Sequence, residues 1–128
     1  MPRMKIVLRV LVLLPALLFV VSGVRWLIAP AGVAPSFGLT LGDGIALSSQ
    51  VGDMAAFFLT LGACMLIALI SGRRTWYYPA IMLLSLAAID RVLAWLLHDA
   101  ALALHLIGPE VLVSIILLVA ARYLPEKS

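Results

Sequence analysis

The chain has little charge and few of the residues that build common catalytic or metal sites. Only 12% of its 128 residues are charged, against about 25% in an average soluble domain. Its single cysteine, Cys64, excludes an intrachain disulfide and any CxxC redox or zinc motif, and is expected to be a small packing residue. No GxSxG, HExxH or phosphate-binding glycine loop occurs. The basic residues are scattered, without the aromatic interleaving typical of nucleic-acid binding, so no nucleic-acid partner is expected.

What the chain does have is long apolar segments. Hydrophobic residues make up 65% of it and the mean hydropathy is +1.20, whereas a soluble domain is about 45–50% apolar. Four segments reach the length of about 20 residues that a membrane-spanning helix needs. The sequence therefore predicts an all-α, four-transmembrane-helix bundle in one integral membrane domain, residues 1–128. The helices are expected at about 6–29, 50–71, 76–98 and 101–123, with an outer loop at 30–49.

The basic residues predict the orientation of this bundle. With four spans both termini lie on one side, and seven of the nine Lys and Arg residues fall at that set of helix ends: Arg3, Lys5, Arg9, Arg73, Arg74, Arg122 and Lys127. Only Arg25 lies at the other set of ends, and Arg91 lies within a span. The positive-inside rule then places both termini in the cytoplasm of a bacterial-type inner membrane.

Polar residues inside the apolar segments are expected to gather at one depth. At about 1.5 Å per residue, Asp90 and Arg91 lie about 21–22 Å from the start of the third helix, and Glu110 lies about 18 Å from the end of the fourth. Arg91 and Glu110 are therefore predicted to form an ion pair between these helices. Asp90 lies about 100° round the helix from Arg91 and is predicted to face the first two helices, with Arg25 as a candidate partner.

The second predicted helix has two further features. Gly52, Ala56, Thr60 and Cys64 recur every four residues, a pattern that lets another helix approach closely. Asp53 is expected in the first turn, where the helix dipole favours a carboxylate; a role in a polar site is the alternative. The long loop before this helix is expected to be either a functional lid or interfacial segment, or a passive surface loop.

Three interpretations of the polar residues stay open at this point. They can fix helix register as a structural ion pair, bind a small molecule or ion, or lie in a subunit interface. The histidines have no metal-ligand spacing, so no metal site is expected, and no catalytic residue is assigned. The candidate ligand-binding or ion-pair residues are Arg25, Asp53, Asp90, Arg91, His98 and Glu110.

Three stretches together are similar to a known group of membrane proteins. The stretches are GDMAAFFLTLG at 52–62, IDRVLAWLLHDAAL at 89–102 and PEVLVSIILL at 109–118. Over about residues 50–120 the chain resembles the DoxX-like group of small four-helix bacterial inner-membrane proteins, including its uncharacterised domain families. The resemblance implies that Arg91, Asp99 and Glu110 occupy polar positions of that group. It also implies a role like that of relatives described as accessory subunits of quinone-linked oxidoreductases.

A looser likeness is to sterol-isomerase-type four-helix proteins, which use membrane acids around a hydrophobic cavity. In that case Asp53, Asp90 and Glu110 would be the acids, but Arg91 argues against the likeness because a fixed cation repels a cationic intermediate.

The sequence therefore favours a non-catalytic subunit or scaffold that binds an amphiphile such as a quinone or a lipid. Membrane lipids, other membrane subunits or further copies of the chain are the expected partners. The alternative is a membrane enzyme or transporter for a small hydrophobic molecule that uses the acid and arginine cluster. An enzyme would need a cavity of several hundred cubic ångströms beside these residues, whereas a subunit would show a filled core and an exposed stripe of small residues.

Overall fold

A computed structural model describes residues 2–126, and all regular structure in that range is helical. The four long helices are α1 (Pro2–Ile28), α3 (Ile45–Ser71), α4 (Tyr77–His98) and α5 (Leu104–Tyr123). Three short ones lie in the connections: α2 (Pro30–Val33), η1 (Ala34–Phe37) and η2 (Arg74–Trp76). Four helical spans are long and apolar enough to cross a membrane. The predicted all-α, four-helix fold of a multi-pass membrane protein is confirmed.

Helix α3 begins earlier than the sequence suggested, at Ile45 rather than near residue 50. Gly44, with φ 56° and ψ −123°, ends the preceding loop, and Ala46 and Leu47 then continue the helical path. No acidic residue lies in the first turn of α3. The expectation that Asp53 lies in that turn was therefore wrong, because the helix already extends over the serine-containing segment before it.

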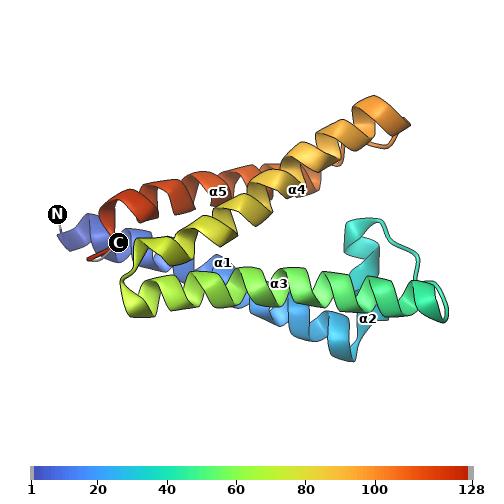
Figure 1. Ribbon diagram of the computed structural model, residues 1–128, viewed down its shortest axis with the longest axis horizontal. Helices are drawn as coiled ribbons and strands as arrows, with labels where there is room; N and C mark the ends of the chain where they lie inside the picture. The colour runs from blue at the N-terminus through green and yellow to red at the C-terminus, as the bar shows by residue number, and fades with distance from the viewer. Residues whose placement is uncertain (1, 127–128) are drawn as a thin grey trace.

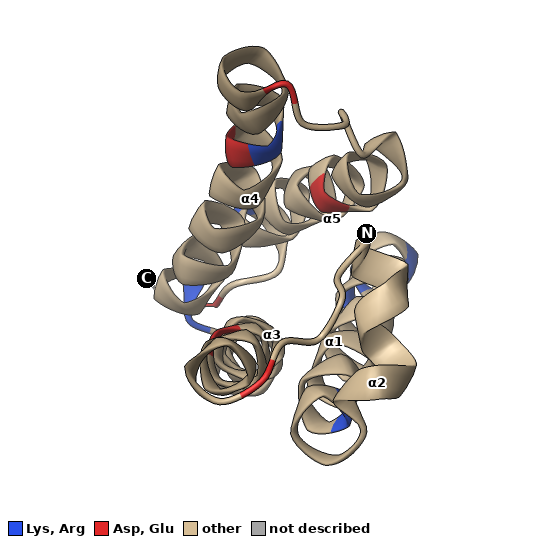
Figure 2. Ribbon diagram, turned by 90° about the vertical axis from the view of Figure 1, so that its right-hand side faces the viewer, with Lys and Arg blue, Asp and Glu red and all other residues tan. Residues whose placement is uncertain are grey.

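The long helices are arranged as two pairs. Helix α1 packs mainly on α3, and α4 packs mainly on α5. Both termini lie at one end of the molecule, here called the terminal end, and the opposite end is called the loop end (Figure 1). The halves of the bundle next to these ends are called the terminal half and the loop half. Seen from the loop end, the α4–α5 pair lies beside the α1–α3 pair, and toward that end α4 diverges from α3 (Figures 1 and 2). Lys127, counted among the basic residues of the terminal end, lies outside the described residues.

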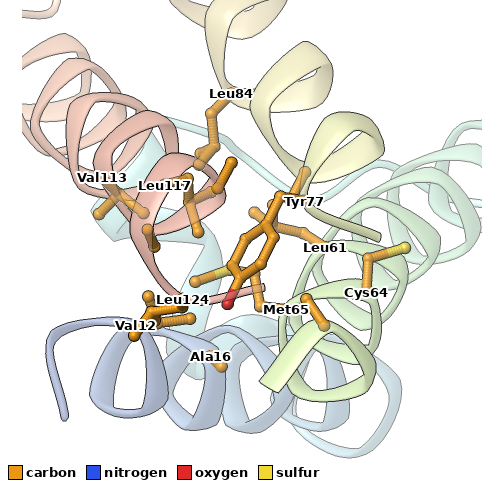
Figure 3. Close-up of a cluster of buried hydrophobic side chains, with 14 of the residues drawn as sticks. Val12, Ala16, Leu61, Cys64, Met65, Tyr77, Leu84, Val113, Leu117 and Leu124 are labelled. Atoms are coloured by element: carbon orange, nitrogen blue, oxygen red, sulfur yellow. The ribbon is translucent and has the colours of Figure 1, made fainter. Parts of the chain in front are cut away.

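All four long helices contribute to one apolar core in the terminal half. Figure 3 shows the ring of Tyr77 at its centre, with side chains of α1, α3 and α5 around it. Tyr77, Leu61 and Leu117 are almost completely buried. We call this cluster the terminal core; its buried members are Leu8, Val12, Ala16, Leu61, Cys64, Met65, Ala68, Tyr77, Ala80, Leu84, Val113, Leu117, Ala120, Ala121 and Leu124.

A second, smaller core lies near the loop end and involves neither α4 nor α5. Its buried members are Trp26, Val33, Ala34, Ala55 and Phe58, from α1, the connection and α3. The connection at 29–44 folds over this core: Phe37, Leu39 and Leu41 pack against it, whereas Ile45 is 86% exposed. The loop therefore closes one end of the α1–α3 pair instead of lying entirely outside it.

Close contact between α1 and α3 depends on glycines that the small-residue pattern did not single out. A Cβ on Gly62 would lie 2.6 Å from Val20 Cγ2 and 2.8 Å from the Ala16 carbonyl oxygen. By contrast, Gly52, Ala56 and Thr60 are exposed, and only the last member of that stripe, Cys64, is buried. The three exposed members of the stripe are not buried between helices of this chain, so their role in a contact with another chain stays a prediction.

Candidate functional site

A partly open cavity of about 190 Å³ lies where the two helix pairs meet in the loop half. Its walls come from every long helix and from η1, so it forms only when both pairs are in place. The surface of the cavity is mainly apolar. We call it the phenyl cavity; its lining residues are Leu18, Phe19, Ser22, Phe37, Phe57, Phe58, Leu84, Leu106, Pro109 and Glu110.

All four phenylalanines of the chain line this cavity. Phe58 is central among them: the centroid of its ring lies 5.9 Å from that of Phe19, 5.3 Å from that of Phe37 and 5.1 Å from that of Phe57. The Phe57 and Phe58 rings meet edge to face, at 89°. These separations fall in the range of favourable aromatic pairs. The rings thus give one wall of the cavity a fixed aromatic surface.

The one charged residue that lines the cavity is held by an ion pair. Arg91 Nε donates a hydrogen bond to Glu110 Oε1 at 3.0 Å, and the side chains of Arg91 and Glu110 are 29% and 12% exposed. The ion pair predicted from the depths of these residues in α4 and α5 is therefore present. Ser114 Oγ, one turn further along α5, donates to the Glu110 carbonyl oxygen at 2.8 Å.

The ion pair leaves hydrogen-bonding capacity free at the edge of the cavity. A guanidinium group carries five N–H donors, and a carboxylate can accept through both oxygens. Among the described residues, Arg91 donates only through Nε, and Glu110 accepts only through Oε1. One carboxylate oxygen and both terminal guanidinium nitrogens are thus available to a ligand or to water. The site therefore offers an apolar compartment lined by one carboxylic acid residue, Glu110, which Arg91 holds from outside the lining.

The structure does not bring the other candidate residues to this cavity. Asp53, Asp90 and His98 are all exposed and do not line it. Arg25 Nη2 donates to the Gly32 carbonyl oxygen at 3.2 Å, which links the end of α1 to the α2 turn. Among residues 2–126 no ion pair joins Asp90 to Arg25, so that expected partnership was wrong. Arg25 instead satisfies a carbonyl of the connection that folds back over α1.

The aromatic wall is the part of the site that the sequence interpretation missed. Helical spacing identifies residues that share a face of one helix, but Phe19, Phe37 and Phe58 come from three different elements. The distribution of phenylalanine along the chain did hint at an aromatic cluster, because all four phenylalanines occur before residue 59 and none occurs in the last two helices. Recognising that they meet requires the fold of the connection that carries Phe37.

Comparisons of the chain with protein families, curated proteins and solved structures find no match. The phenyl cavity and its ion pair are thus the features from which a function can be argued.

Proposed function

We propose that this protein is a non-catalytic inner-membrane subunit that binds a ring-sized group of an amphiphile, such as a quinone or lipid, in the phenyl cavity. The observation that carries the proposal is the cavity itself, which four phenylalanines and Glu110 line together, the Glu110 side chain accepting one hydrogen bond among the described residues. An apolar ring would lie against Phe58, and a hydroxyl on that ring would donate to Glu110.

The size of the cavity favours a ring over a large ligand. Sites for drug-sized molecules usually measure about 300–1,000 Å³, whereas an apolar cavity of about 150 Å³ accommodates benzene. At about 190 Å³ the phenyl cavity matches one six-membered ring. The rest of the amphiphile would extend out of the cavity through its open side and lie along the helices in the membrane.

Two observations favour a subunit over an independent enzyme. The cavity is smaller than an enzyme acting on such a molecule would need, and the stripe of Gly52, Ala56 and Thr60 is exposed. An exposed stripe of small residues on a membrane helix permits close approach of another helix. We therefore propose a partner subunit or a second copy of the chain on this face of α3.

The DoxX-like assignment and the orientation belong to the same proposal. The pairing of Arg91 with Glu110 supports the DoxX-like assignment, because the resemblance implies that both residues occupy polar positions of that group. The bias of basic residues toward the terminal end supports a cytoplasmic location for both termini.

An enzyme or transporter is the second candidate, favoured by one specific observation. Glu110 lines an apolar cavity, and one of its carboxylate oxygens has no hydrogen-bond partner among the described residues, so this oxygen could exchange a proton with a bound hydroxyl. In that case replacement of Glu110 by Gln would abolish turnover while ligand binding persisted. In a binding subunit the same variant would weaken ligand binding, and no turnover would be measured before or after the substitution.

Fluorescence quenching by a short-tailed benzoquinone tests the proposed ligand class. Trp26 lies next to the cavity wall, with its ring centroid 6.0 Å from that of Phe37. In a variant with Trp76 and Trp95 replaced by Phe, Trp26 is the only tryptophan left. We expect saturable quenching of Trp26, lost when Ser22→Leu fills the cavity and kept in the control Thr60→Leu, which adds the same side chain on an exposed face of α3.

Two outcomes would contradict the proposal. One is quenching that rises linearly with benzoquinone without saturating, which indicates partition into the detergent alone. The other is equal binding by the Ser22→Leu and Thr60→Leu variants, which places the ligand outside the cavity. Native mass spectrometry of the gently extracted protein adds the identity of any lipid, quinone or partner chain that it retains.

A further inference from the structure

A second hollow lies at the other end of the molecule, on the outside of the α4–α5 pair. It is an open groove of about 670 Å³ lined by Arg74, Tyr78, Leu118, Ala121, Arg122 and Tyr123. We call it the arginine groove. It shares no residue with the phenyl cavity, which lies in the opposite half of the molecule.

The two arginines of this groove are held in different ways. Arg74 Nε donates to the Ala121 carbonyl oxygen at 2.8 Å, so a half-buried guanidinium on η2 is fixed against the last turns of α5. Arg122 is exposed, and its guanidinium carbon lies 5.7 Å from the centroid of the Tyr123 ring. The terminal nitrogens of both side chains make no hydrogen bond to any described residue.

No acidic side chain balances these two charges. None of the residues lining the groove is acidic, and neither arginine forms an ion pair within residues 2–126. Glu126, the one acid described at the terminal end, lines a separate pocket with Arg9 and Gly72. Two arginines therefore line one groove with no carboxylate partner among the described residues, and an anion is the ligand that charge-assisted hydrogen bonds from guanidinium groups favour.

The position of the groove indicates which kind of anion would bind there. It lies at the start of α4 and the end of α5, where the apolar spans end. Tyr78 and Tyr123 are both about half exposed there, as is usual for aromatic side chains at a membrane surface. Leu118 continues the groove toward the apolar part of α5. The groove thus joins a cationic site at headgroup level to an apolar surface at acyl-chain level.

We propose that the arginine groove binds an anionic phospholipid, with the phosphodiester between Arg74 and Arg122 and an acyl chain along Leu118. A zwitterionic lipid suits the groove less well, because its ammonium group would lie close to two guanidinium groups. Basic pockets between transmembrane helices have this kind of lipid preference. The bound lipid would bridge η2 and α5 and reinforce the contact that Arg74 already makes with Ala121.

Native mass spectrometry with defined lipids tests this proposal. The delipidated protein in detergent is titrated with phosphatidylglycerol or with phosphatidylcholine, and bound lipid is counted. We expect tighter binding of phosphatidylglycerol, weakened about fivefold by Arg122→Gln, since each basic residue near an anionic surface contributes about 1 kcal/mol. The side chain of Arg122 makes no hydrogen bond within the described residues, so this variant should fold normally.

The neighbouring Arg73 provides a matched control. It is exposed, does not line the groove, and its side chain makes no hydrogen bond among the described residues. Arg73→Gln should leave phosphatidylglycerol binding unchanged, while Arg74→Gln should weaken it as Arg122→Gln does. Equal weakening by Arg73→Gln and Arg122→Gln would mean diffuse attraction by the basic end and would overturn the proposal. Equal binding of the two lipids, or competition by glycerol phosphate as strong as by the lipid, would also overturn it.

Discussion

The two halves of the bundle differ in how many helices share a core. In the terminal half, buried side chains of α1, α3, α4 and α5 pack together. In the loop half, the buried cluster contains only α1, α3 and their connection. Within the described residues, no side chain of α4 after Ala88 is buried, and none of α5 before Val113. The terminal half therefore supplies most of the tertiary stability, and the loop half leaves room for a ligand.

The Arg91–Glu110 ion pair lies where the shared core has ended. It joins α4 to α5 on the loop side of Ala88 and Val113, which are the buried residues of these two helices nearest the loop end. A polar link suits this region because few apolar contacts remain there to fix the register of the pair. Glu110, one member of the pair, also lines the phenyl cavity. The ion pair and the proposed ligand site thus share Glu110.

The largest effect is expected from a substitution at the α1–α3 contact. Gly62→Leu should destabilise the protein by about 3 kcal/mol or prevent folding, because overpacking of this size forces helices apart and a Cβ alone would lie 2.6 Å from Val20 Cγ2. Gly52→Leu is the matched control, since a Cβ there meets no atom within 4 Å. Thermal unfolding in detergent measures both. Equal midpoints for the two variants would show that α1 and α3 are not in close contact.

Leucine truncations in the two halves should differ in cost. Leu117→Ala removes a fully buried side chain of the terminal core and should cost about 3 kcal/mol. Leu106→Ala removes a half-buried side chain at the edge of the phenyl cavity and should cost about 1 kcal/mol. Denaturation in mixed micelles gives both values. A larger loss from Leu106→Ala would reverse the assignment of stability to the terminal half.

Breaking the ion pair should have an intermediate effect. A fully buried pair loses about 3–5 kcal/mol when one partner is removed. Since the Arg91 side chain is 29% exposed, we expect about 2 kcal/mol for Arg91→Leu or Glu110→Gln. The double variant should recover most of this loss in stability but still bind benzoquinone poorly. Asp90→Asn, at an exposed acid one residue away, is the control. Additive single and double effects would show that the two groups do not interact.

The smallest effect is expected at Trp26. Its indole nitrogen is the one buried side-chain nitrogen or oxygen without a hydrogen-bond partner among the described residues. Trp26→Phe removes this unpaired donor, a gain that offsets the loss of packed volume. The unfolding midpoint should therefore change little. A loss as large as that of Leu117→Ala would indicate that a bound water or ligand satisfies the indole nitrogen.

The sequence predicted the fold well but only part of the site. Hydrophobic segments alone specify four membrane-length helices, because the bilayer requires that length and apolar character. Depth along the helices predicted the Arg91–Glu110 pair, because both residues lie in regular helices of known rise. Depth does not specify rotation about a helix axis or the path of a loop. For this reason the partner of Asp90 and the position of Phe37 were not predictable.

Distances between spin labels test most directly the claim that the helix pairs separate around a ligand cavity. With Cys64 replaced by Ala, labels at exposed Ile70 and Met82 report on the terminal half, and labels at exposed Ala56 and Leu97 report on the loop half. Pulsed electron–electron double resonance should give a narrow terminal-half distribution that benzoquinone leaves unchanged. The loop-half distribution should become narrower when benzoquinone binds, and Ser22→Leu should abolish that change. Loop-half distances that benzoquinone does not alter, or that change equally in the Ser22→Leu variant, would contradict the account.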